Sequence, residues 1–499
     1  MFETPSAIAA ISRAARDRSL RGRVALQAAR ETITYGDLIG RIERISGALL
    51  ARGLRRGGRV GLLAGRSVDA AAGVFGIMTA GGAVCVLDPH QTPAETRARL
   101  ASAEISWVLA DEAHAGAAAD SSPRELIRIE DTASARPRAL DDLGPDDDAL
   151  LVCTTGSTGV SKAVLLTHGN LLSNARGVAG RTGVTPADRV LHMLPLYHTN
   201  GVNNLLLVPF GCGAAVLMLD HFRAETFFDE IAALRPTYVT GVATHYSRLL
   251  RYPPPRGALA SLRFLRSGAA PLSAQLHREV ERHLGLPLIH SYGLSEATCT
   301  VAMNPPGARR IGTVGTVLAG QHLVVFAPAT ETPVPAGTEG EICVAGASLM
   351  KGYVPPAAGA DGPSIRNGWL RTGDLGWMDG DGYLTVSGRL KEIIIRGGEN
   401  LSPGRIEEAI LRHPAVRACC VIGAPHADLG EVPVAFIVVH EGLAAPESVI
   451  RGQVAAELPR ACVPARVITV EALPEIGIGK IDRKALKQLA VNSRINFPG

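Results

Sequence analysis

Thr154-Thr155-Gly156-Ser157-Thr158-Gly159-Val160-Ser161-Lys162 follows directly on the apolar stretch Ala149-Leu150-Leu151-Val152-Cys153. The apolar stretch predicts a buried strand, and the segment after it predicts a phosphate-binding loop. Gly156 and Gly159 permit positive φ and close approach of the backbone, so that amide N–H groups can converge on an anion. Hydroxyl groups add donors at Thr154, Thr155, Ser157 and Thr158, and Lys162 adds a positive charge.

Two other nucleotide-binding loops do not fit this segment. A Walker A loop ends in Gly-Lys-Ser/Thr, whereas Ser161 precedes Lys162 here and Ala163 follows it. The Gly-x-Gly-x-x-Gly pattern of dinucleotide-binding folds does not follow the strand either. An ordinary surface turn is the remaining alternative for the loop taken alone.

The composition is that of a large globular protein. A chain of 499 residues is too long for one core, so two to four domains or subdomains are expected. Apolar residues make up 46% and charged residues 20%, and 51 basic residues nearly balance 47 acidic ones, for a net charge of +4. Without a dense Lys/Arg run or interleaved aromatics, no nucleic-acid partner is expected.

The cysteines and the apolar segments predict a cytoplasmic protein without a membrane span. Eight scattered cysteines without a Cys-x-x-Cys pair fit neither a zinc site nor a disulfide framework, and the N-terminus lacks a signal-peptide core. The uncharged stretch 70–87 is interrupted by glycines, and we expect a buried helix over about 68–80 and a strand over 83–87. The stretch 205–219 is shorter and is broken by Pro209.

The pattern along the chain predicts an α/β protein. Over about 30–300, short apolar runs alternate with helical patterns, which indicates parallel sheets with crossover helices; the acidic stretch 113–148 is expected to be a loose excursion. Residues 310–388 predict a small antiparallel barrel or sheet. The remaining residues predict a small α/β domain, with the boundary near Lys391 and domains 1–390 and 391–499.

Further segments with polar chemistry follow the loop in order. They are Leu194-Pro195-Leu196-Tyr197-His198-Thr199-Asn200-Gly201, Ser267-Gly268-Ala269-Ala270-Pro271, His290-Ser291-Tyr292-Gly293-Leu294-Ser295-Glu296, Thr372-Gly373-Asp374, Gly388-Arg389-Leu390-Lys391-Glu392, Gly397-Gly398-Glu399-Asn400-Leu401-Ser402-Pro403 and Pro474 to Arg483 around Gly479-Lys480. In order and spacing, together with the loop, they resemble the acyl-adenylating superfamily: acyl-CoA synthetases, firefly luciferase and peptide-synthetase adenylation domains. The resemblance covers essentially the whole chain and is nearest to free-standing acyl-CoA ligases.

The resemblance implies a role for each segment. Glu296 would hold the Mg²⁺ that bridges ATP phosphates, Asp374 the ribose hydroxyls, and Lys480 the charge that develops during adenylation. ATP or AMP would contact the loop residues Thr154 to Gly159 and Lys162, and also Gly268, Ala269, Ala270, Ser291, Tyr292, Gly293, Ser295, Asp374 and Arg389. Lys391 would be the hinge of a mobile C-terminal domain, and Gly397 and Gly398 would meet the arm of the thiol substrate. The implied catalytic residues are Lys480, Glu296, Thr155 and His198.

Some positions depart from the family pattern or have a second interpretation. Thr155, Ser157 and Ser161 stand where Ser, Thr and Pro are usual, and Arg405 replaces a usual Glu, which is expected to rewire a local salt bridge. Gly293-x-Ser295-x-Ala297 resembles a serine-hydrolase elbow, but its last position is Ala. His198 fits either a gate beside the acyl group or a packing role.

The acyl pocket is less specified by the sequence. Its expected lining residues are His198, Asn203, Asn204, Gly241, Val242, Ala243, Thr244 and His245. Because no acidic residue stands near His198, an α-amino acid is not expected. A fatty, branched or aromatic acid fits a mostly apolar pocket, and a small dicarboxylate stays open because Arg223 is near in sequence.

The resemblance implies a two-step reaction. A carboxylic acid and ATP would give an acyl-adenylate, and coenzyme A, or the phosphopantetheine arm of a separate acyl carrier protein, would then give the thioester. Mg²⁺ is the implied metal, and a monomer or homodimer is expected. A luciferase-like oxygenase and a non-catalytic binding relative are the rival hypotheses.

Overall fold

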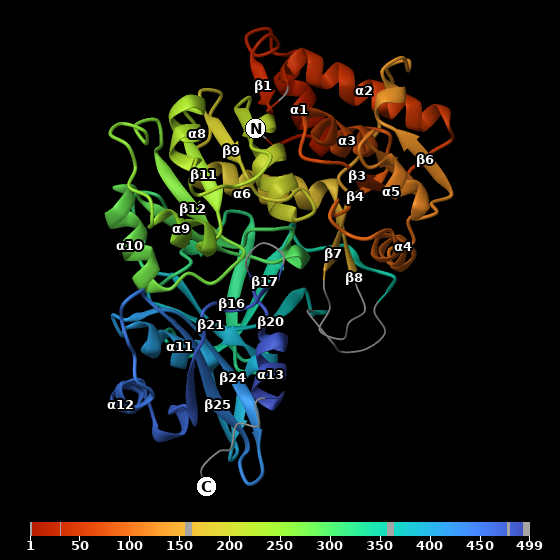
Figure 1. Cartoon of the computed structure of the whole chain (residues 1–499). Helices are drawn as coiled ribbons and strands as arrows, with labels where there is room; N and C mark the ends of the chain where they lie inside the picture. Colours follow the sequence, from red (N-terminus) through yellow and green to blue (C-terminus); the bar gives the residue numbers. More distant parts are fainter. Residues whose placement is uncertain (1, 30, 155–161, 357–363, 477–479, 493–499) are drawn as a thin grey trace.

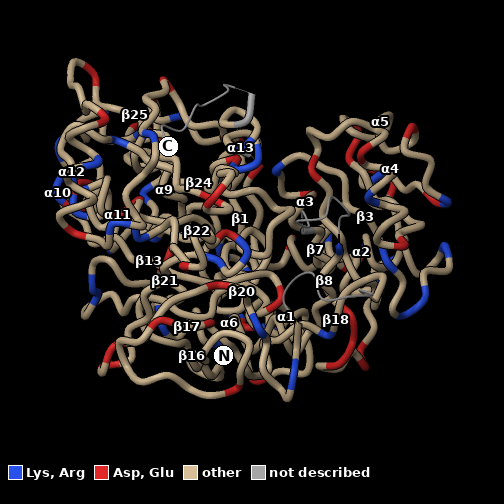
Figure 2. Tube along the Cα trace, turned by 90° about the horizontal axis from the view of Figure 1, so that it is seen from below, with Lys and Arg blue, Asp and Glu red and all other residues tan. Residues whose placement is uncertain are grey.

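A computed structural model describes residues 2–29, 31–154, 162–356, 364–476 and 480–492 (Figure 1). Two sheets with parallel strands form the upper part of the molecule, an antiparallel sheet lies below them, and a small C-terminal unit forms the bottom (Figure 1). This is the α/β architecture that the sequence predicts. Basic and acidic residues are interspersed along the whole trace (Figure 2), in keeping with the nearly balanced charge.

The first sheet carries the predicted phosphate loop. Its strand order is β18 (Gly352–Val354), β8 (Lys162–Thr167), β7 (Asp148–Thr154), β4 (Ala83–Val86), β3 (Arg59–Leu63), β5 (Trp107–Ala110) and β6 (Glu125–Arg128). The strands from β7 to β6 are parallel, whereas β8 pairs antiparallel with both β7 and β18. The loop therefore joins two antiparallel strands rather than a strand and a helix.

The second sheet supplies most of the other predicted site residues. Its strand order is β15 (Thr316–Val317), β14 (Ala302–Met303), β13 (Leu288–Tyr292), β12 (Phe264–Ser267), β11 (Tyr238–Gly241), β9 (Arg189–His192), β10 (Ala215–Met218), β1 (Val24–Gln27) and β2 (Thr32–Thr34). From β1 to β13 neighbouring strands run parallel, so their carboxyl ends meet at one edge. That edge is where polar residues follow each strand.

Helices cover both sheets, and several of them begin at recognisable N-terminal caps. They are α1 (Ala7–Arg16), α2 (Tyr35–Ala51), α3 (Val68–Thr79), α4 (Pro93–Ser102), α5 (Ala115–Asp120), α6 (His168–Thr182), the π-helix η2 (Asn200–Leu207), α7 (Val208–Gly211), α8 (Phe227–Leu234), α9 (Ala243–Leu249) and α10 (Ala274–Leu284). Capping boxes at Thr34, Thr92 and Thr167 begin α2, α4 and α6, because each hydroxyl accepts from a first-turn N–H.

The apolar stretch 70–87 is core, as predicted. Its helix α3 is buried and packs closely on α2, since a Cβ on Gly76 would lie 2.6 Å from Ile45 Cγ2. The stretch 205–219 is divided among η2, α7 and β10. Over the described ranges, no helix is long and apolar enough to cross a membrane.

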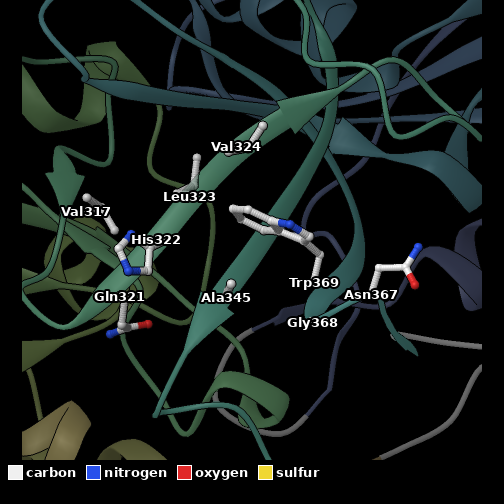
Figure 3. A pocket seen from close by; sticks show the side chains of 9 residues that line it. All are labelled: Val317, Gln321, His322, Leu323, Val324, Ala345, Asn367, Gly368 and Trp369. Atoms are coloured by element: carbon white, nitrogen blue, oxygen red, sulfur yellow. The ribbon is translucent and has the colours of Figure 1, made fainter.

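The antiparallel sheet predicted for 310–388 is present. It consists of β16 (Gln321–Phe326), β17 (Gly340–Gly346), β20 (Trp369–Met378), β19 (Ser364–Arg366) and β21 (Leu384–Arg389). A shallow groove on it is lined by Val317, Gln321 to Val324, Ala345 and Asn367 to Trp369 (Figure 3). None of these residues is among the predicted site residues.

The C-terminal unit is a mixed sheet with helices. Its strands are β23 (Glu399–Leu401), β22 (Ile394–Arg396), β25 (Gly430–Val439), β24 (Val416–His426) and β26 (Arg466–Thr469), with the hairpin β27 (Glu475–Ile476) and β28 (Lys480–Ile481). Its helices are α11 (Pro403–Leu411), α12 (Glu447–Glu457) and α13 (Arg483–Asn492). Ser402 Oγ at the start of α11 donates to Ser387 O of β21, which fastens the unit to the antiparallel sheet.

One expectation about the fold is wrong. Residues 113–148 are not simply a loose excursion, because they contain α5, β6 and the 3₁₀ turn η1 (Glu130–Thr132). Strand β6 extends the first sheet by pairing in parallel with β5. Its polar ends, Glu125 and Arg128, belong to an edge strand, where apolar alternation is weak.

Candidate functional site

A chain of contacts joins Lys162, Tyr353 and Glu296. Lys162 Nζ lies 5.6 Å from the centroid of the Tyr353 ring, and Tyr353 OH donates to Glu296 Oε1 at 2.9 Å. Glu296 lies in the 3₁₀ turn η3 (Ser295–Ala297), just after β13, and Met350 N donates to its backbone oxygen at 2.8 Å. The anchor of the phosphate loop and the predicted metal ligand are therefore linked through one tyrosine.

A second cluster joins Tyr292, Asp374 and Arg389. Tyr292 OH donates to Asp374 Oδ2 at 2.7 Å, and Arg389 Nε lies 3.0 Å from Asp374 Oδ1. The register of β20 and β21 places Asp374 opposite Arg389. Three residues from different predicted segments thus meet at the end of β13.

Burial sets the charge state of the two carboxyl groups. Burial raises the pKa of Glu296, and the hydrogen bond from Tyr353 acts against that shift. Burial also raises the pKa of Asp374, although the Arg389 guanidinium beside it pulls the pKa down. The Asp374 carboxylate also raises the pKa of Glu296, since two negative charges repel.

Two glycines keep the backbone open at this edge. A Cβ on Gly293 would lie 1.6 Å from Cys299 O, so no other residue fits there. A Cβ on Gly268 would lie 2.8 Å from Ser291 Oγ and 3.9 Å from Asn200 Nδ2. Next to it, Ala269 has φ of 63°, a strained conformation for a residue with a side chain.

Most of the expected acyl-pocket residues lie in η2, at the end of β11 and at the start of α9. Gly241 ends β11, and Val242 and Thr244 follow at the start of α9. His198 is half-buried, and its ring centroid lies 4.8 Å from that of Tyr197. Asn203 is fully buried, but its amide donates to Asn174 Oδ1 of α6 at 3.0 Å, so it contacts the core helix.

The predicted hinge and thiol-arm residues are exposed. Lys391 lies in the 3₁₀ turn η4 (Leu390–Glu392) between β21 and β22. Gly397 and Gly398 form the turn between β22 and β23, where φ values of 57° and 85° favour glycine.

Lys480 is the first residue of β28, which pairs with β27, and its side chain lies outside the described residues. Next to it, Glu475 forms an ion pair with Arg248 of α9 at 3.3 Å. The hairpin that carries Lys480 therefore contacts the helix beside the expected acyl pocket.

Arg405 is exposed, whereas the ion pairs of this region involve its neighbour Glu407. Arg483 Nη2 lies 2.8 Å from Glu407 Oε1, and Arg483 Nε lies 3.3 Å from Glu392 Oε2. This triad connects α11, α13 and η4.

Part of the phosphate loop, Thr155, Gly156, Ser157, Thr158, Gly159 and Ser161, lies outside the described residues. Two residues of the site, Tyr353 and Arg266, were not among the predicted site residues. Tyr353 belongs to the segment Lys351-Gly352-Tyr353, which resembles a further family motif and was expected to be mainly structural. Arg266 is completely buried beside Ser291, and one arginine in an apolar strand gave no signal.

Buried carboxylates at the carboxyl edge of parallel strands, linked through Tyr353 to Lys162 at the start of β8, are typical of a class of enzyme that binds a phosphorylated ligand. The chain belongs to the AMP-binding enzymes, in the acyl-adenylate-forming superfamily: the model of that family matches residues 12–354, and the model of the AMP-binding enzyme C-terminal domain matches residues 405–480.

Curated relatives extend the comparison. The chain is 38% identical over 344 residues to a sulfoacetate–CoA ligase of Cupriavidus necator, covering 68% of this chain and 67% of that protein. It is 34% identical over 458 residues to a feruloyl-CoA synthase of an Amycolatopsis species, covering 90% and 92%. Among solved structures, ATP-bound MatB from Rhodopseudomonas palustris matches with a TM-score of 0.90 and 31% identity, covering 97% of this chain and 99% of that one.

Proposed function

We propose that the protein is an AMP-forming acyl-CoA ligase. The observation that carries the proposal is the pairing of the Glu296 and Asp374 clusters at one edge, with the Lys480 hairpin fastened beside them through Arg248 and Glu475. A substrate carboxylate oxygen attacks the α-phosphorus of ATP, the bond to pyrophosphate breaks, and an acyl-adenylate forms. The sulfur of coenzyme A then attacks the acyl carbon, and AMP leaves as the thioester forms.

The residues divide this chemistry among them. The loop 154–159 and Lys162 hold the phosphates, Asp374 and Arg389 the ribose, and Lys480 stabilises the charge that develops at the α-phosphate. Gly268, Ala269 and Ala270 flank the base with Tyr292, and Ser291, Gly293 and Ser295 shape the same edge. His198, Gly241, Val242 and Thr244 border the acid, and Asn203 supports η2.

The donor set fits Mg²⁺ bound together with ATP. Among the described residues no group of three or more His, Cys, Asp or Glu gathers at one point, which argues against a closed protein-only metal site. Mg²⁺ commonly takes one or two carboxylates together with substrate phosphates, and Glu296 supplies such a carboxylate. The ion would neutralise phosphate charge there.

Several details belong to the same proposal. The domains are 1–390 and 391–499, and the smaller one turns about Lys391 so that Gly397 and Gly398 approach the thiol after Lys480 withdraws. A separate acyl carrier protein is the alternative thiol donor. We infer a cytoplasmic monomer or homodimer, since all eight cysteines are free thiols.

Lys480→Ala separates the half-reactions. We expect loss of ATP–pyrophosphate exchange by about 100-fold or more, because one transition-state charge contact is removed. Thioester formation from preformed acyl-adenylate should stay within about threefold of wild type. Lys487→Ala, on the exposed side of α13, is the matched control.

An equal fall of both half-reactions in Lys480→Ala would contradict the assignment of Lys480 to one step. Absence of exchange with any acid of a broad panel would contradict the ligase itself and favour a binding protein. Repeating the second half-reaction with coenzyme A and with a carrier protein identifies the thiol donor.

A further inference from the structure

Arg266 is a buried cation without an anion. It lies on β12 with 2% of its surface exposed, and among the described residues no carboxylate lies within ion-pair distance of it. Two partly buried arginines differ in this respect: Arg371 pairs with Glu341 and Arg483 with Glu407. Burial lowers the pKa of Arg266, which reflects the cost of its charge.

Within the described part of the chain, the hydrogen-bond partners of the guanidinium are all neutral groups. Nη2 donates to Thr300 Oγ1 at 2.7 Å, and Nε donates to Ser291 Oγ at 3.4 Å. Oriented with its Oδ1 toward the arginine, the Asn204 amide accepts from Nη1 at 3.2 Å and from Nη2 at 3.1 Å. These dipoles satisfy hydrogen bonds but leave a net positive charge in the interior, which is costly without a counter-ion.

The guanidinium lies between η2 and β13. It contacts Asn204 of η2 and Ser291, and Ser291 Oγ is also the atom that a Cβ on Gly268 would strike. Thr240 pairs with Arg266 in the parallel register of β11 and β12, so the two side chains point to the same face. Thr240 Oγ1 is completely buried and has no hydrogen-bond partner, which is a second polar group available to a ligand.

We propose that the acid activated by this enzyme carries a second anionic group, a carboxylate or a sulfonate, which pairs with Arg266. The inference rests on the proposed ligase function and specifies its substrate. A guanidinium binds such oxygens with two parallel hydrogen bonds.

The sequence-based candidate for the same task was Arg223, and its position argues against it. Arg223 is exposed, beyond Phe222, whose ring stacks on His245 with centroids 4.3 Å apart. An exposed arginine is screened by water and binds a substrate anion weakly. The buried arginine, by contrast, discriminates strongly, because an acid without the second anion leaves the charge unpaired.

The test compares acids matched in length within one enzyme preparation. Malonate and sulfoacetate are each compared with propionate, and succinate with butyrate, in ATP–pyrophosphate exchange and in thioester formation. We expect at least one dianionic acid to exceed its partner in kcat/KM by about 10- to 100-fold, the range of a charge-assisted hydrogen bond. Malonate against sulfoacetate then tells a carboxylate from a sulfonate.

The matched variants are Arg266→Met, Arg266→Lys and Arg223→Met. Because each preference is a ratio within one preparation, a loss of folded protein cancels. Arg266→Met should bring the ratio to about one, Arg266→Lys should retain part of it, and Arg223→Met should retain all of it.

Three results would overturn the inference while the ligase function stands: preference of the wild type for a monoanionic acid such as butyrate, for an aromatic acid such as ferulate, or an unchanged ratio in Arg266→Met. If none of these acids supported ATP–pyrophosphate exchange, the result would contradict the proposed ligase function as well.

Discussion

Gly293 shows how a single missing side chain shapes the site. The Gly293→Ala methyl would overlap the carbonyl of Cys299, which is backbone and cannot rotate away. We expect destabilisation by more than about 3 kcal/mol, seen as a lower midpoint in thermal unfolding followed by circular dichroism. The control is Gly452→Ala on exposed helix α12, where nothing lies within 4 Å and alanine should stabilise by about 0.5–1 kcal/mol. Equal midpoints for both variants would contradict this account.

Tyr353 tunes the ionisation of Glu296. Its hydrogen bond lowers the pKa of a carboxyl group that burial raises, so Tyr353→Phe should raise that pKa further. Because the protonated carboxyl cannot bind a cation, activity is lost as pH falls through this pKa. The acid limb of kcat/KM for ATP should therefore move to higher pH in Tyr353→Phe and stay in place in Tyr252→Phe, whose hydroxyl contacts Glu225 at the surface. An acid limb that moved to lower pH in Tyr353→Phe would contradict the prediction that the Tyr353 hydrogen bond lowers the pKa of Glu296.

The polar residues of the sequence motifs could be predicted as site residues, whereas the side chains that they contact could not. The sequence pointed to Glu296, Tyr292, Asp374 and Arg389, and the structure brings them together in two clusters, while their roles stay predictions. The charge balance around Arg266 was not predictable. Burial and the lack of a carboxylate are properties of the packed chain, and the pattern Phe264-Leu265-Arg266-Ser267 does not contain them.

The β27–β28 hairpin is held against α9 by an exposed ion pair. Arg248 and Glu475 have side chains that are 52% and 37% exposed, so the pair is worth no more than about 1 kcal/mol. Arg248→Ala should slow ATP–pyrophosphate exchange by at most about fivefold and leave thioester formation from acyl-adenylate unchanged, because the hairpin carries Lys480. Arg251→Ala, one turn away and exposed, should change neither rate. If Arg248→Ala slowed thioester formation more than ATP–pyrophosphate exchange, the contact between Arg248 and Glu475 would belong to the thioester-forming arrangement of the domains instead.

Elements with a clear period and a clear stop were predicted well. The helix expected over about 68–80 is α3, and the strand expected over 83–87 is β4, which ends one residue earlier at Val86. The segment 113–148 was wrong because α5 and β6 are short and largely polar, so that sheet pairing rather than local pattern determines them.

Four buried histidines make the stability of the whole molecule depend on pH. Burial lowers the pKa of His192 to about 3 and those of His168, His245 and His290 to about 4. The unfolded chain takes up protons below its ordinary pKa of about 6.5, whereas the folded chain does not. Stability is therefore fully present above about pH 6.5 and falls toward pH 4, by up to about 1.4 kcal/mol per pH unit for each histidine.

Thermal midpoints measured between about pH 7 and pH 5 test this dependence. His192→Gln removes one titrating group and should flatten the decline, at some cost in stability from the lost contact with Gly201 O. His221→Asn, on the surface, should keep the slope of the wild type. A slope equal in His192→Gln and wild type would exclude His192 as a contributor.

The overall architecture followed from alternating strands and helices, but contacts between distant segments did not. The pairing of β18 with β8 joins two segments that lie far apart in the sequence, and no local pattern predicts it. Lys351 N donates to Leu165 O at 2.9 Å and extends this seam. Such pairings depend on how the subdomains dock, which is a property of the folded chain.

That seam has a consequence for how related chains diverge. Lys162, Tyr353 and Glu296 come from three separate segments, yet each touches the next in a continuous series. A substitution at one of these positions alters the contacts of the other two, so we expect the three positions to change together during evolution. In a collection of related sequences, positions 162, 296 and 353 are expected to co-vary, and a chain that has lost the tyrosine should also have changed at 162 or 296.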